Sequence, residues 1–200
     1  MQNHKPYAPA CDNNKDPILN ILKRSFIEPG LVLEIGSGTG QHAVYFSEHL
    51  PHIIWQPTDR EENLAGISAW QTDADLSNLK PPLELDVAQK PWPAFRADYI
   101  FSANAVHIMS WKMVEKFFSG VEKNLKLNGL LILYGPFNYL GHYTSSSNAQ
   151  FDIWLKDRDP NSGIRDFEAI NQLAENAGML LSEDCEMPAN NRSLIWKKCR

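Results

Sequence analysis

The sequence predicts an α/β fold, a doubly wound and mostly parallel seven-stranded sheet with an antiparallel strand at its C-terminus. Two observations support this prediction. Strand and helix patterns alternate from residue 31 to about residue 135, which is typical of parallel strands joined by crossover helices. The last two strand patterns are separated only by a short polar stretch around residues 188–191. Since a parallel crossover needs about a dozen residues or more, these two strands are expected to run antiparallel.

The first half of the chain is expected to begin with a helix capped by Asp16, with Pro17 in its first position. Its apolar stripe consists of Ile18, Ile21, Leu22 and Phe26. The strands expected in this half cover residues 31–35, 53–56 and 83–85. Helices are expected at about residues 43–50 and 61–71. Pro29-Gly30 and Pro51 end the first and second of the three helices.

The second half continues the alternation and then departs from it. Strands are expected at residues 98–102 and 130–134, with a helix between them that buries Val114, Phe117, Phe118, Val121 and Leu125. The tail is expected to form a helix over about residues 166–177, closed by Gly178, and strands over residues 179–185 and 193–197. Two hundred residues fit one domain, 1–200, with an N-terminal cap segment at 1–30 and a lid at 136–165.

Composition and charge exclude several classes of function. A formal net charge of −5 disfavours a non-specific grip on nucleic acid or anionic lipid. No apolar run is long enough for a membrane span, and the N-terminus does not read as a signal peptide. The cysteines Cys11, Cys185 and Cys199 include no CxxC pair, so neither a metal site nor a disulfide framework is expected. A cytoplasmic location is the simplest expectation.

A glycine-rich loop follows the first expected strand. Its glycines, Gly36, Gly38 and Gly40, have GxGxG spacing with Ser37 inside it. Glycine lets a ligand approach the backbone closely and lets the chain turn into a helix whose first N–H groups face that ligand. The dinucleotide fingerprint GxGxxG would need a third glycine where this chain has Gln41. The spacing therefore argues against a dinucleotide.

Three acids stand at or near the ends of successive expected strands. Glu34 precedes the loop, and we expect it to orient the loop amides or to face a ligand ammonium through water; the alternative is a purely structural role. Asp59 stands where an acid would bind the two hydroxyls of a ribose; the alternative role is to cap the helix that follows. Asp86, with the amide of Val87, suits an adenine ring. Because ligands of open α/β sheets bind at the carboxyl ends of the strands, the set points to S-adenosylmethionine, with S-adenosylhomocysteine as product.

Several unusual strings are spread over nearly the whole chain. They are Asn14 to Ile18, Leu33 to His42, Trp55 to Asp59, Asn104 to Ile108, Tyr134 to Phe137, Ser147-Asn148, Phe151-Asp152, Gly163 to Asp166 and Met187 to Asn191. In these segments the sequence resembles the methyltransferase-like 26 family, described mainly as a domain of unknown function with the Rossmann-like class I adenosylmethionine-dependent methyltransferase fold. This resemblance implies the fold and, more generally, a methyl transfer.

Two residues after the fourth expected strand are candidates for catalysis. His107 is the best candidate for a general base because its unperturbed pKa is about 6.5, although it could instead tie down its own loop. Asn104 is a candidate for contact with the cofactor or the acceptor. His42, in the first turn of a helix, is expected to be neutral and structural. The Asn/Asp-Pro-Pro-aromatic string typical of amino-methylating enzymes is absent, because this chain has Ser102-Ala103-Asn104-Ala105.

A pocket for the methyl acceptor is expected between the N-terminal segment, the lid and the turn before the last strand. The alternative is that these segments only pack on the surface. The residues proposed to bind the acceptor are Asn14, Phe137, Asn138, Arg165, Asn190 and Asn191.

Three functions remain open from the sequence. The first is methyl transfer to an unidentified small-molecule or protein acceptor. The second is a sensor or partner-binding module that holds the cofactor without catalysis. The third is a nicotinamide-dependent oxidoreductase, against which Gln41 and the reversed last strand both count. The acceptor and the oligomeric state are not specified by the sequence.

Overall fold

The computed structural model describes residues 5–89, 92–93 and 95–200. The first four residues of the expected N-terminal cap segment lie outside this description. No helix in the described part of the chain is both long and apolar enough to span a membrane.

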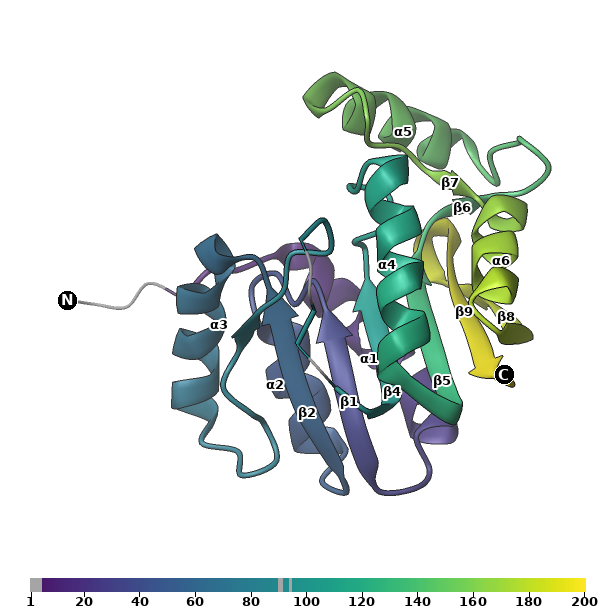
Figure 1. Cartoon of the computed structure of the whole chain (residues 1–200). Helices are drawn as coiled ribbons and strands as arrows, with labels where there is room; N and C mark the ends of the chain where they lie inside the picture. Colours follow the sequence, from purple (N-terminus) through teal and green to yellow (C-terminus); the bar gives the residue numbers. More distant parts are fainter. Residues whose placement is uncertain (1–4, 90–91, 94) are drawn as a thin grey trace.

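The main sheet has seven strands in the order β3-β2-β1-β4-β5-β9-β8 (Figure 1). The strands are β1 (Gly30–Ile35), β2 (Ile53–Asp59), β3 (Leu83–Glu84), β4 (Ala97–Ala103), β5 (Leu125–Gly135), β8 (Met179–Met187) and β9 (Asn191–Lys198). Strand β9 is antiparallel to both of its neighbours, whereas the pairs from β3 to β5 are parallel. The predicted sheet and its reversed strand are confirmed.

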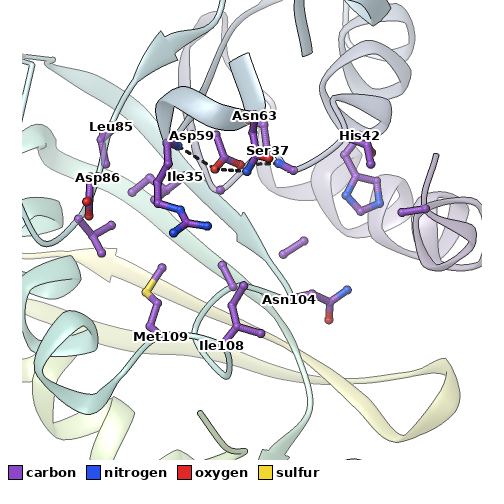
Figure 2. Close-up of a pocket in the computed structure, with 18 of the residues that line it drawn as sticks. Ile35, Ser37, His42, Asp59, Asn63, Leu85, Asp86, Asn104, Ile108 and Met109 are labelled. Carbon is purple, nitrogen blue, oxygen red and sulfur yellow. Dashed lines mark hydrogen bonds between the residues drawn. The ribbon is translucent and has the colours of Figure 1, made fainter. Parts of the chain in front are cut away.

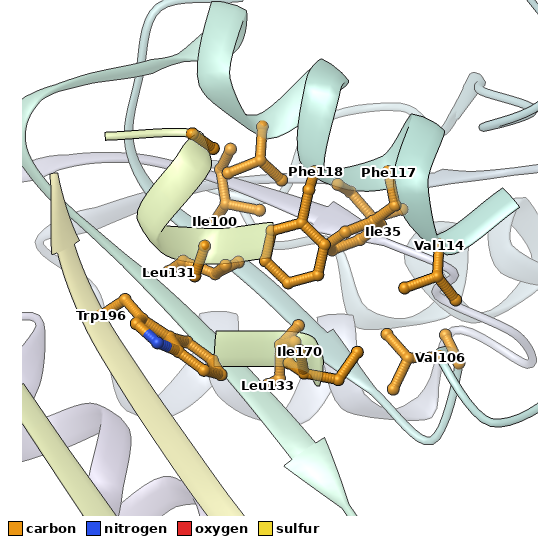
Figure 3. Packing of buried hydrophobic residues seen from close by; sticks show 14 of the residues in the cluster. Ile35, Ile100, Val106, Val114, Phe117, Phe118, Leu131, Leu133, Ile170 and Trp196 are labelled. Atoms are coloured by element: carbon orange, nitrogen blue, oxygen red, sulfur yellow. The ribbon is translucent and has the colours of Figure 1, made fainter. Parts of the chain in front are cut away.

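Helices cover both faces of this sheet (Figure 1). They are α1 (Pro9–Ser25), α2 (Gln41–His49), α3 (Glu61–Ala74), α4 (Trp111–Asn124), α5 (Ser146–Arg158) and α6 (Phe167–Asn176). Side chains of α1 and α2 form one core with residues of the sheet such as Phe101 and Ile132. On the opposite face, α4 and α6 form the second core, in which Phe118, Leu133 and Trp196 are almost fully buried (Figure 3). The sheet therefore lies between two layers of helix, with one core on each face.

The start of α1 differs from the prediction. The helix begins at Pro9, with Ala8 as its N-cap, so Asp16 is not a cap and Pro17 lies inside the helix. The sequence contains two prolines that suit a first helical position, and the earlier one is used. Contacts with α2 hold the middle of α1 in place, because Asn14 binds His42 and Asp16 accepts a hydrogen bond from the Tyr45 hydroxyl.

A smaller difference concerns Leu125, expected at the end of α4. It is the first residue of β5 and is still buried, at 3% exposed. The apolar period of a helix and the inward face of the following strand meet at this residue, so the pattern alone does not locate the boundary.

The segment 136–165 carries α5 and two short strands, β6 (Phe137–Asn138) and β7 (Arg165–Asp166), which pair in parallel. Figure 1 shows this segment above the carboxyl ends of β4 and β5. Helix α5 carries Phe151, Trp154 and Leu155, of which Leu155 is buried. Whether the segment acts as a lid stays a prediction.

Candidate functional site

A cavity of about 470 Å³ lies at the carboxyl ends of β1, β2 and β4. It is lined by Ala8, Ala10, Cys11, Ile35, Gly36, Ser37, Gly38, Thr39, His42, Asp59, Arg60, Asn63, Leu85, Asp86, Val87, Ala103, Asn104, Ala105, Ile108, Met109, Ser110, Met113 and Asp159. In Figure 2, Leu85, Asp86 and Met109 lie toward one end, and His42 and Asn104 lie toward the other. Ligands of open α/β sheets bind at this edge.

The glycine loop turns sharply between β1 and α2. Gly36, Gly38 and Gly40 all have positive φ angles, of 77°, 58° and 90°, which only glycine adopts freely. The amides of Gly36 and Ser37 both donate to the Thr58 carbonyl at 3.0 Å, which ties the loop to β2. No atom lies within 4 Å of the position that a Cβ on Gly38 would take, so there is room for a ligand beside the backbone.

Gly40 has a different role from the other two glycines. A Cβ there would lie 2.9 Å from the Ile67 Cα, so Gly40 permits α2 and α3 to approach closely. It does not line the cavity. Neighbouring Gln41 accepts hydrogen bonds from the Ala8 amide at 2.7 Å and the Thr39 hydroxyl at 3.0 Å. Gln41 thus holds the N-terminal segment against the loop, a role that the sequence did not indicate.

Glu34 lies behind the loop, 1% exposed and outside the cavity wall. Its Oε2 accepts hydrogen bonds from the Ser37 hydroxyl at 2.7 Å and the Trp55 indole at 3.0 Å. Burial raises the pKa of Glu34 to about 7, against the lowering effect of these two hydrogen bonds. Ser37 thus both lines the cavity and donates to this carboxyl.

Asp59 is the last residue of β2 and lines the cavity. Its Oδ2 accepts the Gly38 amide at 2.6 Å, and its Oδ1 accepts the Arg60 amide and the Asn63 side chain, each at 2.8 Å. The N-cap of α3 is Arg60 rather than Asp59. A carboxylate offers about four acceptor sites, so one remains on Oδ2 for a ligand hydroxyl after these three donors.

Asp86 and Val87 lie at the other end of the cavity, just beyond β3. The Asp86 Oδ1 accepts the Ala88 amide at 2.8 Å, which fixes the turn. Apolar side chains surround this end, with Leu85, Val87 and Met109 each under a tenth exposed. An apolar slot with an acid at its rim suits a flat ring that carries an amino group.

Asn104 lines the cavity from the end of β4 and has a left-handed backbone, with φ of 55°. Its amide donates to the Tyr134 carbonyl at 2.8 Å, which holds this strained residue at the top of the neighbouring strand. The structure therefore brings Asn104 together with the glycine loop and Asp59 around one cavity.

His107 lies close by but is not on the cavity wall. Only 4% of it is exposed, and its Nδ1 has no hydrogen-bond partner among the described residues. Its ring meets Phe151 of α5 edge-on, with centroids 5.3 Å apart. Burial, followed by the nearby Arg165 charge, lowers the pKa of His107 to about 4, so the ring is neutral at pH 7.

His42 is neutral, as expected, but it also lines the cavity. Its Nε2 lies 2.7 Å from the Asn14 Oδ1, and burial lowers the pKa of His42 to about 4. Asn14 also acts on the Tyr134 hydroxyl, where it and Asn191 lower a pKa that burial raises.

The residues proposed for the acceptor do not line the cavity. Phe137 is fully buried in the core and Asn138 is 8% exposed. Asn190 accepts from and donates to side chains at the start of α5, since its carbonyl binds Asn148 and its amide donates to Ser147. The Asn14 and Asn191 side chains meet at Tyr134, and Arg165 binds backbone carbonyls. Contact of these residues with an acceptor stays a prediction.

Several cavity residues were not predicted from the sequence. Asn63 lies one helical turn after Asp59, a spacing that could have indicated it, and Leu85 directly precedes Asp86. Met109 and Met113 follow the expected loop residues. For Ala8, Ala10 and Cys11 no sequence signal exists, because only the path of the N-terminal segment brings them to the cavity.

The charges on the wall favour a cationic ligand. Three of the lining residues, Asp59, Asp86 and Asp159, carry carboxylates. The positive charge of Arg60, which also lines the cavity, is offset by Glu62 at 2.8 Å. Among the residues that the structure describes, no group of three or more His, Cys, Asp or Glu is arranged to hold a metal ion. An organic cation with hydroxyl groups and a flat ring matches these walls.

Comparison with known proteins places this chain in a family. Residues 5–198 match the family model described as "Protein of unknown function (DUF938)". The chain belongs to this family. Its match covers almost every element of the fold, including the strands and loops that form the cavity.

Solved structures share the fold at low sequence identity. An O-methyltransferase family protein from Burkholderia thailandensis superposes with a TM-score of 0.83 and 13% identity, over 95% of this chain and 57% of that one. An O-methyltransferase family 2 protein from Planctomyces limnophilus, in complex with apigenin, has a TM-score of 0.75 and 14% identity, over 93% of this chain and 62% of that one. Human N-acetylserotonin methyltransferase, in complex with S-adenosylmethionine, has a TM-score of 0.75 and 16% identity, over 96% of this chain and 53% of that one. The fold is therefore the class I methyltransferase fold.

The chain spans a little over half the length of these structures, from 53% to 62%. The superpositions nevertheless cover 93% to 96% of this chain.

Proposed function

We propose that this protein is an S-adenosylmethionine-dependent methyltransferase. The observation that carries the proposal is the arrangement of Asp59, which accepts the Gly38 amide and keeps an acceptor site free beside the loop, with Asp86 at the apolar end of the same cavity. Asp59 would hold the ribose, Asp86 and Val87 the adenine, and the loop from Gly36 to Gly38 the methionyl group. The bound cofactor would supply an electrophilic methyl group on a sulfonium.

The residues of the chain fit this cofactor in charge as well as in shape. The negative carboxylates on the wall would attract a positively charged sulfonium. The buried Glu34 would add to this attraction from behind Ser37, which donates a hydrogen bond to it. The compared structures give no support to the oxidoreductase alternative, and Gln41 uses its side chain to hold Ala8 where a dinucleotide site has glycine. Membership of the methyltransferase-like 26 family and a cytoplasmic location belong to the same proposal.

The acceptor in this proposal is a small molecule or a protein side chain that reaches the cavity beside Asn104 and Ile108. Ile108 lines the cavity and is 55% exposed, so the wall opens to solvent there. In methyl transfer much of the acceleration comes from holding the acceptor in line at about 3 to 3.5 Å. Asn104, fixed by the Tyr134 carbonyl, would take part in that positioning.

A second candidate function is binding of the cofactor without transfer. One observation favours it: His107, the candidate base, is buried and absent from the cavity wall. Transfer of labelled methyl groups into cell extract, separated into small-molecule and protein fractions, distinguishes the two functions. Incorporation that is lost in Asn104→Ala, with cofactor affinity kept, supports the enzyme; cofactor binding with no incorporation supports the module.

Calorimetric titration tests the proposal itself. Purified protein should bind S-adenosylmethionine and S-adenosylhomocysteine, with one site per chain. If neither ligand bound up to millimolar concentration, the proposal would be wrong.

A further inference from the structure

The Arg165 side chain holds the loop that follows β4 by hydrogen bonds to backbone carbonyls. Its Nη2 donates to the Met109 carbonyl and, at 2.8 Å, to the Asn161 carbonyl, and its Nε lies 3.4 Å from the Val106 carbonyl. Met109 lines the cavity, as do its neighbours Ile108 and Ser110. Arg165 itself does not line the cavity. It acts on the cavity only through this loop.

Two backbone amides next to Arg165 add further hydrogen bonds between this segment, the loop after β4 and α5. The Gly163 amide donates to the His107 carbonyl at 2.8 Å, and the Ile164 amide donates to Asp152 Oδ1 at 2.7 Å. Asp152 is 2% exposed and also accepts Tyr143 and Lys156 through Oδ2, at 2.7 and 2.5 Å. This buried carboxylate anchors the strand that carries Arg165 to α5.

His107 lies within this network of contacts. The ring packs against Phe151 of α5, and its Nδ1 faces Gly135 at the end of β5, where a Cβ would come within 3.6 Å. Arg165, on the segment after α5, is the charged group that acts on the ring, and the Asp152 carboxylate in turn acts on the Arg165 charge. An imidazole between a phenyl ring, a glycine and a guanidinium is held neutral.

We propose that Arg165 is a positioning residue for the methyl transfer proposed above, because it fixes the carbonyls of Val106 and Met109 and with them the cavity wall and the His107 side chain. This inference rests on the proposed function. It also gives the segment 136–165 a role that does not depend on its acting as a lid, since this segment holds in place a loop that lines the cavity. Arginine suits the task, because its planar fork binds several carbonyls at once and it stays charged.

Two substitutions separate the fork from the charge. Arg165→Lys keeps the charge and loses the fork, whereas Arg165→Gln keeps a donor and loses the charge. The matched controls are Arg158→Lys and Arg158→Gln, because Arg158 is exposed at the end of the neighbouring α5 and stacks on Trp154 at 4.7 Å. The readouts are the affinity for S-adenosylhomocysteine by calorimetry and the titration of His107 by NMR of its ring.

Both Arg165 variants should bind S-adenosylhomocysteine about tenfold more weakly, because the ligand must then order a loop that Arg165 holds in place in the wild type. Only Arg165→Gln should move the His107 titration midpoint upward from about 4, toward its ordinary value of about 6.5. The Arg158 controls should match the wild type in both measurements.

The proposal is overturned if folded Arg165→Lys binds as tightly as the wild type and Arg165→Gln leaves the His107 midpoint unchanged. If Arg165→Gln does not fold, the affinity of Arg165→Lys decides, since it keeps the buried charge. If the wild type binds no cofactor, the proposed function fails, and the His107 titration alone then decides whether Arg165 positions that ring.

Discussion

Asp59 and Glu34 share the work of shaping the glycine loop, but only Asp59 meets the cavity. Asp59 accepts the Gly38 amide at 2.6 Å, so its charge stabilises the loop before any ligand arrives. Glu34 accepts from Ser37 and Trp55 and has a pKa of about 7 because it is buried. Asp59 is therefore the carboxylate placed to contact a ligand, whereas Glu34 is buried behind the loop.

The first prediction concerns Asp59→Asn. The amide keeps the shape of the side chain but loses its charge, so both the Gly38 contact and the free site weaken. We expect the affinity for S-adenosylmethionine to fall about 10- to 100-fold, because a hydrogen bond to a charged group contributes about 1.5–3 kcal/mol. Calorimetry measures this, with the exposed Asp157→Asn as control. An unchanged affinity would remove Asp59 from the site.

The second prediction concerns protons released on binding. Near pH 7 Glu34 is only partly ionised, and a cation in the cavity favours its ionised form. Binding of S-adenosylmethionine should therefore release a fraction of a proton, and S-adenosylhomocysteine, which lacks the sulfonium, should release less. Calorimetry in two buffers of different ionisation enthalpy measures the release. Glu34→Gln should abolish the difference between the ligands, and a difference that persists in this variant would contradict the explanation.

At the scale of elements, the N-terminal strap, residues 5–8, joins α3 to α2 beside the cavity. Lys5 pairs with Asp73 at 2.5 Å, and the Pro6 carbonyl accepts the Trp70 indole at 2.7 Å. The Ala8 amide reaches Gln41. Figure 1 shows the chain passing from beside α3 to α1. Because Ala8 lines the cavity, the strap forms part of its wall.

The third prediction tests the strap with Gly66→Ala. A Cβ on Gly66 would lie 2.6 Å from the Pro6 Cγ and displace the strap, while alanine favours the helix itself by roughly 0.5–1 kcal/mol. S-adenosylhomocysteine should then dissociate several-fold faster without loss of folding stability. Stopped-flow displacement measures the rate, with the exposed Thr72→Ala on the same helix as control. Equal rates in Gly66→Ala and Thr72→Ala would mean that the strap does not retain the ligand.

At the scale of the whole molecule, three buried groups control stability between about pH 5 and 6. Unfolded histidines bind protons below about 6.5, but folded His42 and His107 do so only below about 4, so acid favours unfolding through both. Folded Glu34 binds a proton below about 7 and the unfolded residue only below 4.5, so acid favours folding through this group. The unfolded chain thus binds about one proton more than the folded chain.

The fourth prediction follows from that difference. The free energy of unfolding should fall by about 1.4 kcal/mol for each pH unit between pH 6 and 5. The slope should approach zero in His107→Gln and roughly double in Glu34→Gln. Urea unfolding at several pH values measures these slopes. Identical slopes in the two variants would show that these groups do not titrate as the structure indicates.

The sequence determined the order of strands and helices, because apolar periodicity is a local property that each segment carries by itself. It also located the glycine loop, Asp59 and Asp86, since these positions follow from where strands end. It misplaced the start of α1, where Asp16-Pro17 has the pattern of a helix start but the helix begins at Pro9. The same local information could not show that Gln41 would bind Ala8.

Only the tertiary structure decided which side chains share the cavity. His42 and Cys11 reach it, whereas His107 and Phe137 turn into packed surroundings. Arg165 emerged as a ligand of backbone carbonyls more than fifty residues away in sequence. Such contacts join segments that are remote in the chain, so they depend on how the helices pack on both faces of the sheet and not on the pattern of any one segment.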